Sequence, residues 1–273
     1  MRVGVYYFSA TGNTLAGLLM LKKALEELGH LCELKPVEKQ EPNSLSDAHD
    51  LVGFASPVFY GQPSEVLLRF IRTLPRQEKL RPAFIILCSG APGGTLGSRE
   101  LLVDLLVQKS FWVLAELVLL GEDSHPLLRR LRYLLPFHGD GRPDERDEAI
   151  IRRFATELVE AYRAFSSGER PSVPYRPILK CFSLLGWRLS ILLRKSLMAK
   201  VLDANRCDGC GLCELTCPAE AIVMVKGKPS FKLICAGCLR CVNFCPREAI
   251  VFRAFKKLDR YRRRAALILS VLL

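Results

Sequence analysis

Two cysteine motifs of identical spacing constrain this chain more than any other feature. Each motif reads C-x-x-C-x-x-C-x-x-x-C and is followed by a proline, and the second begins 28 residues after the first. The motif cysteines are Cys207, Cys210, Cys213 and Cys217, then Cys235, Cys238, Cys241 and Cys245. The similarity extends past the cysteines, because Glu-Ala-Ile-Val occurs at 220–223 and again at 248–251. The block is therefore an internal duplication of one small unit.

This spacing favours iron–sulfur clusters over the other uses of cysteine. Three closely spaced thiolates suit three corners of an iron–sulfur cube, while the fourth ligand comes from elsewhere in the chain. A zinc site is the alternative, but zinc needs four ligands and leaves the third and fourth cysteines of each copy without a use. Disulfides are not expected, because we recognise no export signal and therefore expect a reducing, cytoplasmic setting.

Residues 203–252 resemble a bacterial ferredoxin with two [4Fe-4S] clusters. In such two-cluster proteins the fourth cysteine of a motif ligates the other cluster. The resemblance implies that Cys207, Cys210, Cys213 and Cys245 hold one cluster, and that Cys235, Cys238, Cys241 and Cys217 hold the second.

The first part of the chain alternates between strand-like and helix-like stretches. Apolar runs predict strands at 3–8, 31–37, 51–55, 83–88 and 112–120. Stretches with helical spacing predict helices at 14–28, 64–72, 98–108 and 146–165. Five strands that alternate with helices predict an α/β fold with an open, doubly wound parallel sheet, followed by a small α+β unit that carries the cysteines.

A loop suited to a phosphate follows the first strand. Its hydroxyl side chains and the helix start behind it favour an anion, and it contains neither a Walker lysine nor a dinucleotide fingerprint. With the loops after the third and fourth strands, residues 1–165 resemble flavodoxin, which implies bound FMN. The expected FMN-binding residues are Ser9, Thr11, Gly12, Asn13 and Thr14, then Pro57, Val58, Phe59, Tyr60 and Gly61, then Ser89, Gly90, Ala91, Gly93 and Gly94.

The flavin prediction has a weak point in the loop at 89–94. Phe59 or Tyr60 offers an aromatic ring for one flavin face, but the loop at 89–94 contains no aromatic residue for the other. A flavodoxin-like scaffold with ordinary turns and no flavin is the alternative. Cys32, Cys88 and Cys181 lie outside the motifs and are expected to be small buried side chains.

Charge divides the chain into four segments. The net charge is +12, and the excess lies in residues 168–206 and 251–273, whereas residues 1–167 are nearly neutral. We expect a flavodoxin-like domain at 1–167, a basic amphipathic linker at 168–202, a ferredoxin-like domain at 203–252 and a basic, apolar tail at 253–273. The neutral first domain argues against specific nucleic-acid binding. No apolar run is long enough to span a membrane, although residues 178–200 or the tail could lie on a membrane surface. Residues 178–200 could equally pack between the domains.

The whole arrangement resembles flavodoxin–ferredoxin fusion proteins of anaerobic bacteria and archaea. The resemblance implies an electron-transfer protein that connects FMN, two [4Fe-4S] clusters and redox protein partners. We expect an acidic partner, steered by Arg260, Arg262, Arg263 and Arg264, although a solvated basic run is the simpler interpretation of that segment. Two alternatives remain: an FMN-dependent reductase that the clusters supply with electrons, and a redox-sensing regulator.

Overall fold

A parallel sheet forms the centre of the first domain. The computed structural model describes residues 1–41, 45–91, 94–95, 97–126, 129, 139–176, 181, 185, 199–258 and 260–272. The parallel strands are β1 (Arg2–Tyr7), β2 (Leu31–Pro36), β3 (Leu51–Phe59), β5 (Arg81–Ser89) and β6 (Phe111–Leu120), in the order β2-β1-β3-β5-β6. This confirms the predicted five-stranded doubly wound sheet. A short strand that the sequence did not predict, β4 (Gln62–Pro63), pairs antiparallel with β3.

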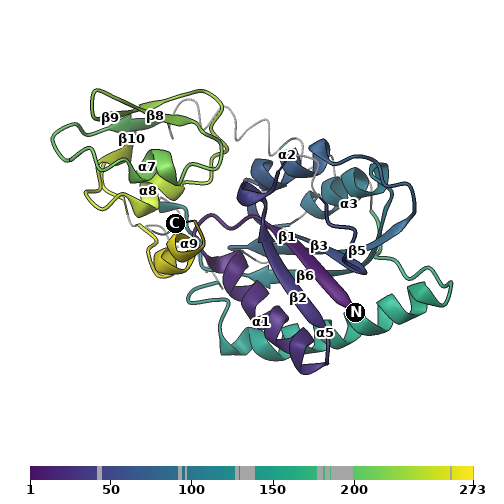
Figure 1. The fold of residues 1–273 in the computed structure, drawn as a ribbon. Helices are drawn as coiled ribbons and strands as arrows, with labels where there is room; N and C mark the ends of the chain where they lie inside the picture. Colours follow the sequence, from purple (N-terminus) through teal and green to yellow (C-terminus); the bar gives the residue numbers. More distant parts are fainter. Residues whose placement is uncertain are drawn as a thin grey trace.

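Helices cover both faces of this sheet (Figure 1). Helices α1 (Asn13–Glu27) and α5 (Glu145–Ser166) pack on one face, and α2 (Glu65–Thr73) and α3 (Ser98–Gln108) pack on the other. Alternate residues of β1 divide between the two cores, since Val5 is buried with α1 and α5 while Tyr6 is buried with α2. The apolar run of β1 therefore reflects burial on both faces.

The cysteine-rich part forms a second, smaller unit. Its strands are β7 (Lys200–Leu202) paired with β10 (Ile250–Phe252), and β8 (Ile222–Val225) paired with β9 (Lys228–Phe231), both antiparallel. Two short helices, α7 (Leu212–Leu215) and α8 (Arg240–Phe244), have Gly211 and Leu239 as N-cap residues, and both of these have a positive φ. Glu220 and Glu248 also share a positive φ. The sequence duplication is thus repeated in the backbone, and the unit lies over the carboxyl edge of the large sheet (Figure 1).

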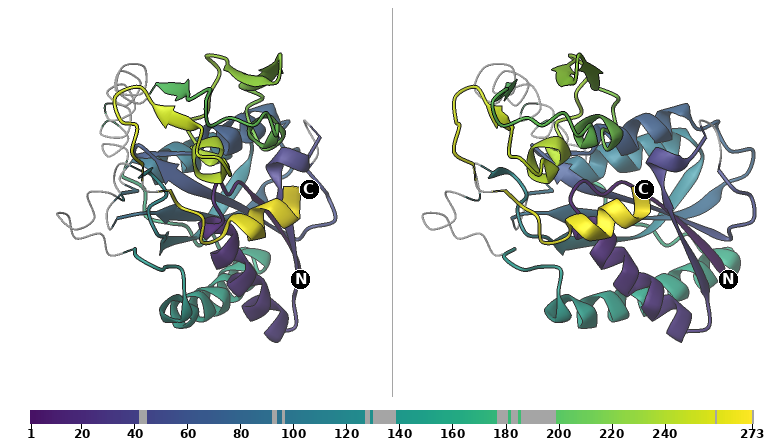
Figure 2. Two further views of the ribbon diagram at one scale, coloured as in Figure 1. Left: turned by 90° about the vertical axis from the view of Figure 1, so that its left-hand side faces the viewer. Right: turned by 60° about the vertical axis from the view of Figure 1, so that its left-hand side comes forward.

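Residues 260–272, which we call the arm, pack back onto the first domain. Helix α9 (Ala265–Leu272) lies beside the start of α1 (Figure 2), and Ile268 is buried in the same core as Leu15 and Leu18. The sequence placed these residues in a separate tail, because it gave no sign of the long-range contact.

The arginines of the arm form hydrogen bonds and ion pairs with other residues of the protein. Arg260 donates to the carbonyl oxygens of Glu248 and Ile250, and Arg264 donates to those of Gly141 and Pro143. The more exposed Arg262 and Arg263 form ion pairs with Glu248 and Glu122. The interpretation of this segment as a solvated run is therefore wrong for Arg260 and Arg264, which bond within the protein. Steering of an acidic partner by the four arginines stays a prediction.

Most of residues 178–200 lie outside the described residues, so the predicted basic amphipathic linker remains a prediction. None of the helices in the described ranges is long and apolar enough to cross a membrane.

Candidate functional site

A cavity of about 260 Å³ opens at the carboxyl edge of the sheet. The three loops predicted from the sequence meet around it. The predicted residues that line it are Ser9, Thr11, Asn13, Thr14, Pro57, Val58, Phe59, Tyr60, Gly61, Ser89, Gly90, Ala91 and Gly94. Gly12 is not among its lining residues, and Gly93 lies outside the described residues.

The loop after β1 retains an unused hydroxyl inside this cavity. Ser9 Oγ accepts a hydrogen bond from the backbone N–H of Leu15 at 3.2 Å and so helps to cap α1. Thr14 Oγ1 is buried beside the Cys88 thiol and has no nitrogen or oxygen partner among the described residues. A buried donor without a strong acceptor is costly, so this position fits a ligand that supplies one, such as a phosphate oxygen.

Two residues of this loop serve the arm. The Asn13 Nδ2 group donates to the carbonyl oxygen of Glu122 at 2.6 Å, and Asn13 Oδ1 accepts from the Tyr261 hydroxyl at 2.6 Å and from Arg264 at 2.5 Å. A Cβ atom on Gly12 would lie 2.4 Å from the Cβ of Arg264. The sequence assigned both residues to FMN, which stays a prediction; the structure adds contacts of both residues with the arm, while Asn13 also lines the cavity.

A fourth loop, within the long connection to which the sequence gave no role, completes the cavity. Residues 121–125 follow β6 and line the cavity, with Asp123 and His125 among them. Burial raises the pKa of the Asp123 carboxyl, and burial lowers the pKa of His125 to about 4. Their place directly after the last parallel strand was the available signal, because ligands of such sheets bind at the carboxyl ends of the strands.

Aromatic rings connect this cavity with the cysteine-rich unit. The Tyr60 ring meets the His125 ring edge-on with centroids 6.1 Å apart, and the His125 ring stacks on Phe252 of β10 at 5.8 Å. His125 therefore contacts both units.

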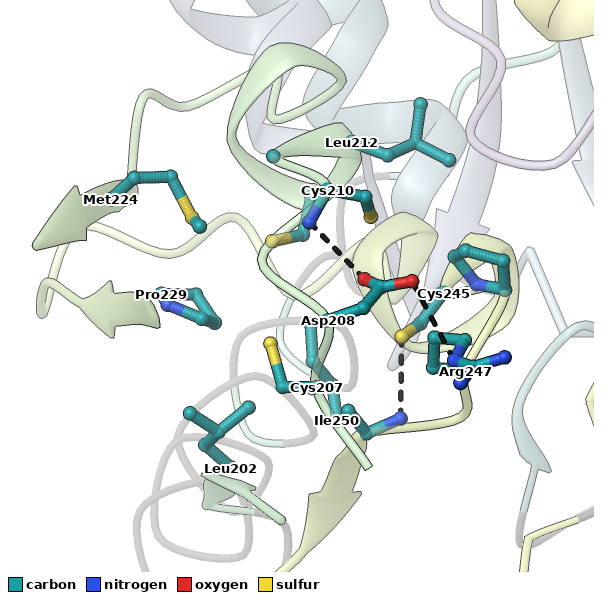
Figure 3. Close-up of a pocket in the computed structure, with 14 residues that line it drawn as sticks. Leu202, Cys207, Asp208, Cys210, Leu212, Met224, Pro229, Cys245, Arg247 and Ile250 are labelled. Carbon is teal, nitrogen blue, oxygen red and sulfur yellow. Dashed lines mark hydrogen bonds and ion pairs between the residues drawn. The ribbon is translucent and has the colours of Figure 1, made fainter. Parts of the chain in front are cut away.

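The motif cysteines surround two separate pockets. Cys207, Cys210, Cys213 and Cys245 line the first (Figure 3), and Cys217, Cys235, Cys238 and Cys241 line the second. Within the described residues, no three His, Cys, Asp or Glu side chains come together as they would around a single metal ion. The linings of the two pockets therefore group the fourth cysteine of each motif with the first three cysteines of the other motif.

The surroundings of the sulfurs fit iron–sulfur clusters. The backbone N–H of Ala221 donates to Cys217 Sγ, and the equivalent N–H of Ala249 donates to Cys245 Sγ, both at 3.2 Å. Burial raises the pKa of Cys238 to about 11 and that of Cys241 to about 12. Burial therefore disfavours free thiolates here, and the positive charge of bound iron would offset that cost.

The other cysteines have no comparable setting. Cys32 and Cys88 are buried as expected, and burial raises the pKa of each to about 12, whereas Cys181 is exposed, contrary to the expectation.

Comparison with known proteins gives the cysteine-rich unit a family. Residues 206–250 match the family model described as a 4Fe-4S dicluster domain. The chain joins a flavodoxin-like domain to a 4Fe-4S dicluster domain. The first domain is flavodoxin-like because its strand order, β2-β1-β3-β5-β6, is the flavodoxin order of a doubly wound sheet. Such a pair of domains indicates a role in electron transfer. No curated protein matches the chain.

Solved flavodoxins are among the similar structures, with low identity. A flavodoxin from the domain Archaea has 14% identity and a TM-score of 0.42, with 60% of this chain and 99% of that chain covered. Oxidised flavodoxin 1 from Bacillus cereus has 13% identity and a TM-score of 0.44, with 59% and 98% covered. Two-electron-reduced flavodoxin from Megasphaera elsdenii has 18% identity and a TM-score of 0.40, with 59% and 97% covered.

The cavity of the flavodoxin-like domain directly adjoins the dicluster domain. Tyr60, Gly237 and Leu239 line both the cavity and the second cysteine pocket. The first cysteine pocket shares none of its lining residues with the cavity. We therefore call the pocket of Cys217, Cys235, Cys238 and Cys241 the near pocket, and the pocket of Cys207, Cys210, Cys213 and Cys245 the far pocket.

A buried arginine fixes this junction. Arg240 lies between Cys238 and Cys241 in the sequence and is 1% exposed. It donates to the carbonyl oxygens of Ser9 and Ala10 at 2.8 and 3.0 Å, and it forms an ion pair with Glu38 at 2.5 Å. The loop of the near pocket is thus bonded to the loop predicted to hold phosphate.

Proposed function

We propose that this protein transfers electrons between FMN in the cavity and two [4Fe-4S] clusters, one in each cysteine pocket. The observation that carries the proposal is the wall shared by the cavity and the near pocket, formed by Tyr60, Gly237 and Leu239. Centres on the two sides of such a wall would be close enough for direct electron exchange.

The bound groups would supply the redox chemistry, since FMN exchanges one or two electrons and each cluster exchanges one. The chain supplies binding, spacing and exclusion of water. Thr14 would donate its free hydroxyl to the FMN phosphate, and Tyr60 would stand against the ring system. Ile222 and Leu239 contribute apolar surface to the near pocket, while Leu202 and Ile250 do so in the far pocket.

The geometry also supports an order for the proposed centres. The near pocket adjoins the flavin cavity, whereas the far pocket shares no lining residue with it. Electrons would therefore pass between a redox protein partner and FMN by way of the far cluster and then the near cluster. A partner of acidic surface remains our expectation, on the basis of the net charge of +12.

Cofactor content is the first test. Anaerobically purified protein should contain one FMN, about eight irons and about eight labile sulfides per chain. Cys217→Ala should damage the near cluster but leave the far one, and Cys245→Ala should do the reverse, as followed by electron paramagnetic resonance. Bound zinc without labile sulfide would overturn the cluster assignment, and damage confined to the mutated motif would overturn crossed ligation.

The order of the centres has a matched pair of variants, since Cys213 and Cys241 are the third cysteines of the two copies. Cys241→Ala should slow electron exchange between the remaining cluster and FMN, measured by rapid mixing at the flavin absorbance. Cys213→Ala should leave the exchange between the near cluster and FMN fast. Equal rates in the two variants would contradict the proposed order.

A second candidate is a reductase that uses FMN on a small substrate. It is favoured by Asp123, a carboxyl group in the wall of the cavity whose pKa is raised by burial. A reductase should show saturable turnover with a small acceptor, and Asp123→Asn should lower that turnover while cluster-to-FMN transfer stays unchanged. A regulator that binds nucleic acid through the arm is less favoured, because Arg260 and Arg264 are bonded within the protein.

A further inference from the structure

The duplication includes a pair of lysines that differ in their contacts. Lys200 of β7 precedes Cys207 by seven residues, and Lys228 of β9 precedes Cys235 by seven. Each lysine reaches the first cysteine of the other motif, so the lysines cross between the copies as the fourth cysteines do.

The two lysines bond to different atoms. Lys200 Nζ donates to Cys235 Sγ at 2.9 Å. Lys228 Nζ donates instead to the backbone oxygens of Cys207 at 2.5 Å and Ala204 at 3.2 Å. Only the first of these contacts is made to a sulfur that would ligate a cluster.

The charge of Lys200 is also directed at the near pocket. Lys200 lines that pocket, and no carboxylate of the described residues forms an ion pair with it. Arg240, a buried cation that also lines the near pocket, is by contrast paired with Glu38. The ammonium group is therefore an uncompensated positive charge next to a cluster ligand.

We propose that Lys200, acting through Cys235, selectively raises the reduction potential of the near cluster and so distinguishes it from its duplicate in the far pocket. This inference rests on the proposed function. A cluster becomes one unit more negative when it accepts an electron, so a fixed positive charge and a hydrogen bond to sulfur stabilise its reduced form. Lys200 is a positioning residue, because it contacts a ligand and not the iron.

Burial acts in the opposite direction to Lys200, because it lowers the reduction potential expected for the near cluster. Each pocket has one exposed cysteine, Cys235 or Cys210, but only the near pocket also has a buried one, Cys238. A drier setting disfavours the more negative reduced cluster. Without a compensating charge, the near cluster would be the poorer electron acceptor, although it adjoins the flavin cavity. Lys200 offsets this penalty at the junction between the two domains.

The test compares holoprotein variants by redox titration, with each cluster followed by electron paramagnetic resonance. Lys200→Met removes the charge at similar length, Lys200→Arg retains it, and Lys228→Met is the matched control from the other copy. Cys213→Ala, which removes the far cluster, identifies the near-cluster signal. In Lys200→Met the near cluster should show an at least tenfold lower reduced-to-oxidised ratio at a fixed potential, which is a shift of ~59 mV.

The expected pattern is specific. Lys200→Met should leave the far cluster unchanged, Lys200→Arg should retain most of the wild-type potential, and Lys228→Met should shift the far cluster less than Lys200→Met shifts the near one. Two intact clusters with an unmoved near potential would overturn this inference alone. Fewer than two clusters in the wild-type protein would overturn the proposed function, and this inference with it.

Discussion

At Gly12 one residue meets two requirements. Its φ of 104° lies in the region that favours glycine, and a Cβ atom there would lie 2.4 Å from the Arg264 Cβ. Gly12→Ala should therefore cost more than the ~1 kcal/mol expected for backbone strain alone, because it also displaces the arm. We expect weaker FMN binding, measured by quenching of flavin fluorescence, with both clusters retained.

Gly29 provides the control for this substitution. Its φ of 79° is also positive, but nothing lies within 4 Å of a Cβ placed there. Gly29→Ala should show the backbone cost without any change in FMN affinity. If the two variants lost equal stability and bound FMN equally well, the close approach of Arg264 to Gly12 would contribute neither to stability nor to FMN binding.

His125 should stay neutral over the whole physiological range. Burial lowers its pKa to about 4, and the unfolded value is about 6.5. Between these values the unfolded chain binds a proton that the folded protein does not, so stability falls as the pH drops from about 6.5 to 4. The loss amounts to about 3 kcal/mol. Titration of the His125 ring by NMR tests this, and a midpoint near 6.5 would contradict it.

Residues that act locally could be predicted from the sequence, and those that act at long range could not. Ser9 follows a strand and Thr14 lies in the first turn of the next helix, a local pattern that is visible in the sequence. Asn13 looked equally suited to a ligand, but its amide bonds with Tyr261, which lies 248 residues away. No local pattern carries that information.

Helix α9 packs on the first domain and so contributes to the stability of a domain far from it in the sequence. Ile268 is 3% exposed against the core that contains α1, and α1 begins at the loop predicted to hold phosphate. Ile268→Ala should cost about 2–4 kcal/mol of the free energy of unfolding, because it leaves a cavity in that core. FMN affinity should fall with it, since the arm would no longer hold Asn13 and Gly12.

The exposed face of the same helix supplies the control. Ser270 is exposed, so Ser270→Ala should change stability by less than about 0.5 kcal/mol and leave FMN affinity unchanged. Denaturant unfolding under anaerobic conditions measures both variants. An Ile268→Ala protein as stable as Ser270→Ala would show that the arm does not support the first domain.

Prediction of the elements from sequence succeeded where burial repeats regularly. The five parallel strands have apolar runs because both faces of the sheet are covered, and their edges were predicted to within a few residues. The exception was β3, which continues to Phe59, because its last residues pair with the unpredicted β4. Helix α9 is apolar but has no partner in its own neighbourhood, so its place against α1 could not be inferred.

For the whole molecule, the ion pair between Arg240 and Glu38 determines how the two domains meet. Arg240 is 1% exposed, and the Glu38 side chain is 11% exposed. Arg240→Met should destabilise the protein by about 3 kcal/mol, because it leaves the Glu38 carboxylate buried without its partner. Denaturant unfolding and FMN affinity should both change, since Arg240 also bonds to Ser9 and Ala10.

The double variant Arg240→Met/Glu38→Met separates the charge from the packing. Replacement of both partners by apolar groups is often nearly neutral, so much of the lost stability should return. FMN affinity should recover less, because the bonds to Ser9 and Ala10 stay absent. A single variant as stable as the wild-type protein would show that this ion pair does not hold the domains together.

The contact between the arm and Asn13 has a consequence for synthesis. A ribosome would complete the parallel sheet of the first domain long before it reached Tyr261 and Arg264, which bond to Asn13. Until then Asn13 and Gly12 would lack their partners, and the loop between β1 and α1 would be held less firmly. We therefore expect FMN to be retained only late in biogenesis, after the dicluster domain has emerged, so that a nascent chain would not hold a flavin before it had the means to exchange electrons with it.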